Sequence, residues 1–292
     1  MAGAEMHRWE LGGPVDDASI TGQVHLPPGE AGGLPVVLFS PHLLHPLSWG
    51  FYPFLAEQVG RIHPFLLYNG SFSGYREEEG LIGRPDLVEK FTFQSELDDL
   101  DRILAALADG TIPGGERIDR EKLILAGHGK GAAIALLAAG RRREVKALVL
   151  MSALSTLLRF PPEVRADIRS TGFIEVEAPV CGTRVRLGRA MLDEIEGDPE
   201  RFSLERAARA LRVPSVIMHG EEDREVAVKE SESLYHWCIK ERTRLVLMEK
   251  VGHNFGADHP FVQSNKDLDR VVEIFVNFIS QTLAEKEEDR VG

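Results

Sequence analysis

Three short segments of this 292-residue chain carry residue types suited to acyl-transfer chemistry. The first is the glycine-rich turn Gly127-His128-Gly129-Lys130-Gly131, between an apolar run at 123–126 and a run of small residues with helical character. A sharp turn between a strand and a helix is the setting in which the motif G-x-S-x-G presents a serine nucleophile. Here the central residue is Gly129, so the turn is present and the nucleophile is absent.

The other two segments offer an acid and a base. Asp223 ends the segment His219-Gly220-Glu221-Glu222-Asp223 after an apolar run, and His253 lies in Gly252-His253-Asn254-Phe255-Gly256 after another. Nucleophile position, acid and histidine therefore follow one another in the chain order Ser, Asp, His. In such a set, Asp223 orients the imidazole of His253 and stabilises its charged form.

The elements that must position these residues form an alternation of apolar runs and helical patterns, which predicts a mostly parallel, doubly wound α/β sheet. The expected strands are 6–11, 18–26, 36–39, 65–68, 123–126, 146–151, 215–218 and 245–248. The expected helices are 54–59, 94–107, the segment after the elbow, 229–239 and 267–283. Functional groups in such sheets gather beyond the carboxyl ends of the strands, so residues 129, 223 and 253 are expected to meet in one cleft.

The alternation is interrupted at residues 153–210, although the chain is expected to form a single domain over 1–292. This segment contains Pro161-Pro162, an alternating stretch at 174–185 and helical patterns near 191–195 and 204–211. We expect it to be a cap-like insertion packed over the carboxyl end of the sheet.

The composition is typical of a soluble globular protein, and the expected partner is a small-molecule substrate or ligand. A net charge of −12 argues against a nucleic-acid surface, which needs a basic field. The two cysteines, Cys181 and Cys238, cannot form a disulfide framework, and there is no signal-like amino terminus and no apolar run of about 18 residues. The expected location is the cytoplasm, with no membrane partner, and the residue pattern specifies no oligomeric state.

No metal or organic cofactor is expected. The carboxylates in the predicted helix 94–107 lie opposite its apolar residues, without a histidine at ligand spacing, and are interpreted as a solvated face. There is no thiol–imidazole spacing and no phosphate loop in the sequence.

Taken together, the elbow, the acid segment and the histidine segment resemble the α/β-hydrolase superfamily, in particular the bacterial branch related to dienelactone hydrolases and acyl-peptidase-like serine hydrolases. Trp49-Gly50-Phe51 and the segment 257–261 are also similar to that branch. The resemblance runs from the strand at 36–39 through the terminal helix. It implies ester or amide hydrolysis, with the backbone N–H groups of Leu43 and Lys130 binding the oxyanion and His128 as packed scaffold beside the elbow.

The chain departs from this family at two positions. Gly129 replaces the serine and cannot form an acyl-enzyme. Pro41-His42 replaces the family's His-Gly dipeptide, so an imidazole is expected to crowd the oxyanion site. A single glycine is what an engineered inactivation would leave, and the second departure favours natural divergence. Ser40, Ser71 and Ser73 lie on neighbouring loops without the strained elbow and are not expected to replace the nucleophile.

Three hypotheses remain open after the sequence alone. The first is a hydrolase-family protein that has lost its nucleophile and is inactive as a conventional serine hydrolase. The second is a non-hydrolytic enzyme, such as a lyase, isomerase or cofactor-free oxygenase, that uses the pair His253–Asp223. The third is a small-molecule-binding protein without catalytic activity.

Overall fold

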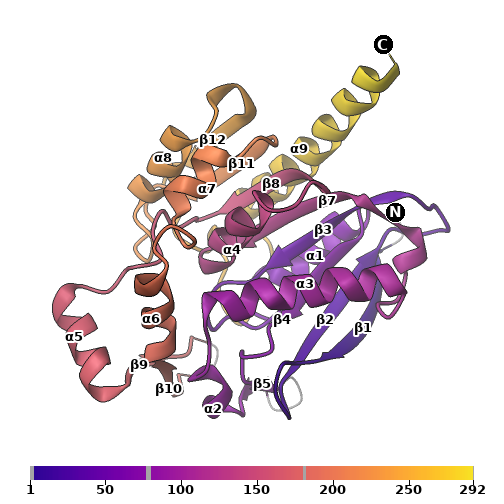
Figure 1. Cartoon of the computed structure of the whole chain (residues 1–292). Coiled ribbons are helices and arrows are strands. Elements are labelled where there is room, and N and C mark those ends of the chain that lie inside the picture. Colours follow the sequence, from indigo (N-terminus) through magenta and orange to yellow (C-terminus); the bar gives the residue numbers. More distant parts are fainter. Residues whose placement is uncertain (1–2, 77–79, 180–181, 292) are drawn as a thin grey trace.

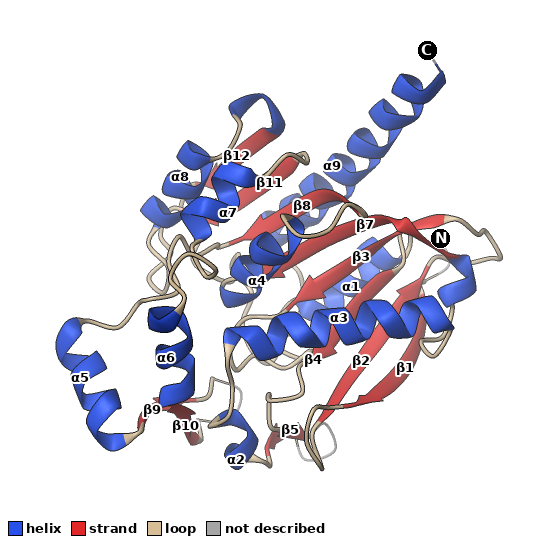
Figure 2. Ribbon diagram, in the orientation of Figure 1, coloured by secondary structure: helices blue, strands red, loops and turns tan. Residues whose placement is uncertain are grey.

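The computed structural model describes residues 3–76, 80–179 and 182–291 and contains an eight-stranded mixed sheet (Figures 1 and 2). The strand order is β1 (Glu5–Gly12), β2 (Ser19–Leu26), β4 (Phe65–Asn69), β3 (Leu34–Ser40), β7 (Ile118–His128), β8 (Val145–Met151), β11 (Ser215–Gly220) and β12 (Thr243–Met248). The strands from β4 to β12 are parallel, whereas β2 is antiparallel to both β1 and β4. The predicted mostly parallel sheet is therefore confirmed.

Helices cover both faces of this sheet, as its apolar sequence requires. The side chains of Val36 and Leu38 in β3 belong to one apolar core and those of Val37 and Phe39 to the other. This alternation follows from the two-residue repeat of a strand, and burial on both faces explains the wholly apolar run. One face is covered by α1 (Tyr52–Gly60) and α9 (Lys266–Val291), and the other by α3 (Phe93–Asp109), α4 (Lys130–Ala139) and α8 (Val228–Trp237) (Figure 1).

The chain changes winding direction between β3 and β7. From β3 it continues to β4 on one side of the sheet, and it later returns to β7 on the other, with Ser40 paired with Gly127. Loops that leave adjacent strands in opposite directions open a crevice at the carboxyl edge. The loop after β3 carries His42, and the turn after β7 carries Gly129.

Residues 153–210 connect β8 to β11. They form α5 (Pro162–Thr171), the antiparallel hairpin β9 (Phe173–Glu177) and β10 (Arg184–Gly188), α6 (Arg189–Gly197) and α7 (Leu204–Ala210). The hairpin, α5 and α6 extend away from the main sheet, near α2 (Pro85–Val88) (Figure 1).

The structure contains several elements that the residue pattern did not predict. Helix α5 begins at Pro162, which the pattern treated as a break; a proline is compatible with the first helical turn, where its missing N–H has no helical partner. Strand β7 begins at Ile118 because its polar first half extends beyond the apolar core. The strands β5 (Tyr75–Arg76) and β6 (Leu81–Ile82) are too short to show an alternating pattern of apolar residues. The same holds for two single 3-10 turns, at 115–117 and 240–242.

Cys238 is a buried free thiol, and Cys181 lies outside the described residues. Within the described ranges, no helix combines the length and hydropathy needed to cross a membrane.

Candidate functional site at the carboxyl edge of the sheet

Asp223 and His253 meet as the sequence predicted. Parallel pairing of β11 with β12 places Gly220 beside Met248, so the two following loops leave the sheet together. Nδ1 of His253 donates a hydrogen bond to Oδ2 of Asp223 at 2.8 Å. Both side chains are almost fully buried, so this contact is shielded from solvent.

The carboxylate of Asp223 is held by further donors. Its Oδ1 accepts hydrogen bonds from the backbone N–H groups of Glu225 and Val226 at 2.9 and 2.8 Å. Nε2 of His219 lies 3.0 Å from Oδ2. Burial opposes ionisation of Asp223, but the hydrogen bonds from His219 and His253 outweigh it and hold its pKa well below the ordinary value. Asp223 is therefore a carboxylate that keeps a proton on Nδ1 of His253.

This tautomer leaves Nε2 of His253 as the basic atom. The residue is only 5% exposed, and Nε2 has no hydrogen-bond partner among the residues that the structure describes. Oε2 of Glu225 lies 3.9 Å from this nitrogen, on a side chain that is half exposed. Because buried polar atoms are nearly always paired, this lone pair requires a partner outside the described residues, such as an ordered water or a ligand.

The turn at Gly129 has the backbone of a strained elbow. Its φ of 54° and ψ of −115° lie in a region that residues with a Cβ rarely adopt. A Cβ built on Gly129 would lie 1.9 Å from Nδ1 of His42 and 2.5 Å from its Cε1. The imidazole of His42 therefore occupies the space that a side chain at residue 129 would need.

His42 also takes one of the two predicted oxyanion donors. The backbone N–H of Lys130, the first residue of α4, donates to Nδ1 of His42 at 2.9 Å. The other predicted donor, the N–H of Leu43, has no partner within the described part of the chain. The pKa of His42 lies well below 6.5, mainly because the ring is buried. The neighbouring His45, His253 and His128 and the charge of Lys130 lower it further.

His128 and Tyr52 join the loops of the site. His128 is fully buried; its Nε2 donates to the carbonyl oxygen of His253 at 3.1 Å, and its Nδ1 lies 2.8 Å from the Tyr52 hydroxyl. The same hydroxyl accepts the backbone N–H of His42 at 3.1 Å. Because burial, His253 and His45 lower the pKa of His128, its ring is neutral and Nδ1 accepts from Tyr52.

A cavity of about 330 Å³ is lined by His42 and Glu225; His253 lies beside both residues but is not part of the cavity wall. The sheet loops contribute His42, Leu43, His45 and Glu225 to its wall, and the α4 start contributes Lys130. Most of the remaining wall is apolar and comes from residues 153–210: Leu154, Leu157, Phe160, Val176, Pro179, Leu187 and Met191. A cavity of this size and composition suits a small, largely apolar molecule.

The side chain of Lys130 does not add a free charge to this cavity. Its Nζ lies 2.8 Å from Oε1 of Glu96, and both side chains are almost completely buried. The ammonium group is therefore neutralised beneath the elbow, while the backbone N–H of the same residue faces His42.

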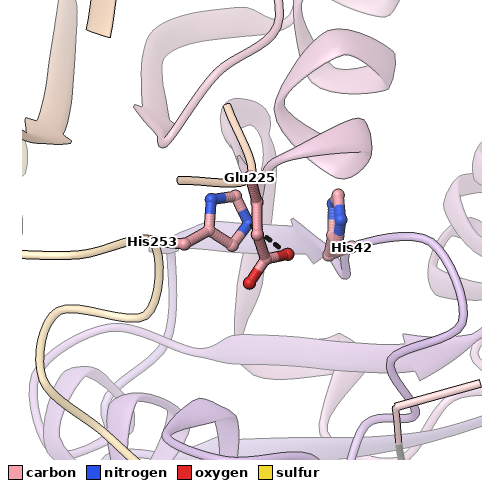
Figure 3. Close-up of side chains that lie close together, drawn as sticks. All are labelled: His42, Glu225 and His253. Atoms are coloured by element: carbon pink, nitrogen blue, oxygen red, sulfur yellow. Dashed lines mark ion pairs between the residues drawn. The ribbon is translucent and has the colours of Figure 1, made fainter. Parts of the chain in front are cut away.

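His42, Glu225 and His253 form the one group in the described residues that brings three potential metal ligands together, with one atom of each within 4.8 Å of the others (Figure 3). Two histidines and a carboxylate can bind iron(II) or zinc. His253 fits, because its Nδ1–H is bound by a carboxylate. His42 does not, because its Nδ1 accepts a hydrogen bond, so its Nε2 carries a proton instead of a lone pair.

Several residues of the site were not assigned a role from the sequence. These are Glu225, His219, Tyr52 and an aromatic stack in which Trp49 lies between His45 and His259, at ring-centre distances of 3.8 and 5.6 Å. The N–H of Gly50 donates to Nδ1 of His259 at 3.0 Å, which joins the two segments whose sequences looked familiar. The resemblance of these two segments to the dienelactone hydrolase branch is the sequence feature that could have identified them. The position of Glu225 depends on the conformation of its loop, which no sequence pattern indicates.

No family model matches this chain, and no curated protein matches its sequence. Solved structures do. The esterase domain of a Rhodothermus marinus protein is 17% identical, with 94% of this chain and 97% of that chain covered and a TM-score of 0.62. A dienelactone hydrolase from Anabaena variabilis is 16% identical over 95% and 98%, with a TM-score of 0.59. The acylaminoacyl peptidase of Pyrococcus horikoshii is 15% identical over 97% and 42%, with a TM-score of 0.64. Similarity at these identities shows a shared fold.

Proposed function

We propose that this chain, which has the α/β-hydrolase fold, moves protons on a small, mostly apolar molecule with His253 as the general base, and that it does not hydrolyse esters through a serine. The observation that carries the proposal is the buried Nε2 of His253, which is basic, unpartnered and fixed in orientation by Asp223. A proton taken up there forms an imidazolium beside a carboxylate, the arrangement that general-base catalysis uses.

The hydrogen bonding of the site's hydroxyl groups supports a mechanism without an acyl-enzyme. Gly129 has none, and the hydroxyls of the nearby serines are bound elsewhere. Oγ of Ser40 pairs with the hydroxyl of Tyr68, and Oγ of Ser71 donates to the carboxylate of Asp99. Oγ of Ser152 donates to the backbone carbonyl of His253 and does not reach the imidazole Nε2.

In this proposal residues 153–210 act as a cap that selects the ligand. They supply most of the apolar cavity wall together with the charged Arg159 and Glu177, whereas the sheet loops supply His42, His45 and Glu225. Substrate preference would then depend on the cap and proton transfer on the loops after β3, β11 and β12.

The test uses 5-nitrobenzisoxazole, whose ring opens when a base removes its carbon-bound proton and which releases a coloured phenolate. We expect saturable acceleration, and a loss in kcat/KM on the order of 10²-fold in His253→Ala, the lower range for a positioned base. His236→Ala, at an exposed histidine of α8, is the matched control and should match the unchanged protein.

Two results would overturn the proposal. One is the absence of acceleration, or acceleration that survives His253→Ala. The other is a burst of p-nitrophenolate from p-nitrophenyl acetate, because a burst requires an accumulating acyl-enzyme.

A further inference from the structure

The hydrogen bonding of His42 fixes which of its nitrogens carries the proton. The N–H groups in the first turn of a helix have no partner within the helix and carry partial positive charge. One of them, at Lys130, donates to Nδ1 of His42 at 2.9 Å. A nitrogen that accepts a hydrogen bond carries no proton, so the imidazole is neutral with its proton on Nε2. The lowered pKa of His42, caused mainly by burial, is consistent with this state.

The Nε2–H of His42 is available to a ligand. It has no hydrogen-bond partner among the described residues, and His42 contributes to the wall of the 330 Å³ cavity. The next residue, Leu43, lines the same cavity and has an unpaired backbone N–H within the described chain. Two consecutive residues therefore offer hydrogen-bond donors where the fold's hydrolases bind an oxyanion, although the N–H of Lys130 itself is occupied.

His253 faces His42 with the opposite hydrogen-bonding character. Its Nε2 is a buried acceptor, and the two imidazole rings have centres 5.1 Å apart and planes inclined at 63°. In Figure 3 the carboxylate of Glu225 lies between the two rings, and one nitrogen of each ring falls within 4.8 Å of the other. When the half-exposed Glu225 side chain turns out from between the rings, a donor and a base this close can both reach one carbonyl fragment, about 3 Å from each.

We propose that the cleft takes an enolisable ketone or aldehyde with an apolar body, with Nε2–H of His42 on the carbonyl oxygen and Nε2 of His253 removing the proton from the adjacent carbon. This inference rests on the proposed function, since it needs His253 as the base, and it adds the substrate class and the role of His42. A neutral imidazole held by a helix N-terminus can polarise a carbonyl, because its remaining N–H is free to donate a hydrogen bond to the carbonyl oxygen.

The proton and electron balance of the step is simple. The carbon–hydrogen bond breaks, its proton passes to Nε2 of His253, and its electron pair forms the carbon–carbon double bond. The carbonyl π pair moves onto oxygen, which His42 and the N–H of Leu43 stabilise by hydrogen bonds. Return of a proton to either face of the carbon regenerates a carbonyl compound, so no oxidant, reductant or co-reactant is needed.

The test follows α-deuterium incorporation into 2-tetralone in D₂O by NMR. We expect the protein to accelerate exchange, and His42→Phe to lower kcat/KM on the order of 10²-fold, as loss of one oxyanion donor does. His42→Gln should recover part of the rate, because its amide can accept from Lys130 and donate to the ketone. His236→Phe is the control for the histidine change and should leave the rate unaltered.

A binding measurement separates the role of His42 from folding. 2-Naphthol resembles the enol of 2-tetralone, so it should bind more tightly than tetralin, which has no oxygen, and His42→Phe should abolish that preference. If 2-naphthol and tetralin bind alike, or if His42→Phe exchanges 2-tetralone as fast as the unchanged protein, the inference is wrong.

The two proposals fail in different ways. Opening of 5-nitrobenzisoxazole without exchange of 2-tetralone would overturn the substrate class and leave His253 as the base. Failure of both reactions would overturn both proposals. His42→Phe should slow exchange much more than ring opening; equal losses would mean that His42 only supports the shape of the cleft.

Discussion

Placing a serine at residue 129 alone should destabilise the protein without producing ester hydrolysis. A Cβ at this position lies 1.9 Å from Nδ1 of His42, whereas ordinary contacts begin near 3.4 Å, so ring and Cβ must separate by about 1.5 Å. That displacement breaks the hydrogen bond from Lys130, which contributes about 1 kcal/mol. The positive φ adds about 1–3 kcal/mol of backbone strain once a Cβ is present.

Gly129→Ser should therefore lower the free energy of unfolding by about 2–4 kcal/mol, measured by urea denaturation. With the double variant His42→Gly/Gly129→Ser the clash is absent and the N–H of Lys130 is released, so the two changes should couple favourably by about 1 kcal/mol or more. The double variant should also show a p-nitrophenolate burst that neither single variant shows. An undamaged Gly129→Ser, or a burst from it while His42 is present, would refute this reasoning.

Three further perturbations follow from the described contacts. Asp223→Asn should slow opening of 5-nitrobenzisoxazole at least tenfold, because the amide no longer selects the tautomer with a basic Nε2 on His253; an unchanged rate would remove the pair from the mechanism. Burial and the neighbouring Glu96 raise the pKa of Asp99 from 3.8 to about 7, so the folded state holds this proton more tightly than the unfolded state. The free energy of unfolding should therefore fall as pH rises from about 4 to about 7. Asp99→Asn should flatten this pH dependence, measured by urea denaturation. Lys130→Met should cost about 3 kcal/mol because it leaves Glu96 buried without its partner, and adding Glu96→Gln should recover much of the loss; additive effects would contradict the pairing.

Most strands and helices of the fold can be predicted from the sequence because both faces of the sheet are buried. A strand such as β3 then becomes a wholly apolar run, and an amphipathic helix such as α3 carries leucines and isoleucines at helical spacing. The α/β-hydrolase fold expected from the motifs is the fold that the solved structures share with this chain. Helix α5 escaped prediction because it buries little beyond Ile168 and begins with proline.

Only part of the site could be predicted from the sequence, because strand order fixes some of its contacts and loop conformation fixes the others. The meeting of Asp223 and His253 follows from strand order, since residues after adjacent parallel strands must lie at one edge. The position of the His42 ring depends on how the loop after β3 folds onto the start of α4, and no periodicity encodes that contact. The sequence shows that His42 stands where the resembling family has a glycine. The contact of its ring with Lys130 and with the space beside Gly129 is visible only in the folded structure.

The contact between His42 and the start of α4 also bears on how this chain can change over generations. A serine introduced first at residue 129 meets the ring of His42, and a glycine introduced first at residue 42 removes the hydrogen bond from Lys130. Each single change therefore carries a stability cost, and only the two changes together place a side chain at residue 129 without the clash. A serine-bearing elbow is therefore reached from this sequence only through a less stable intermediate.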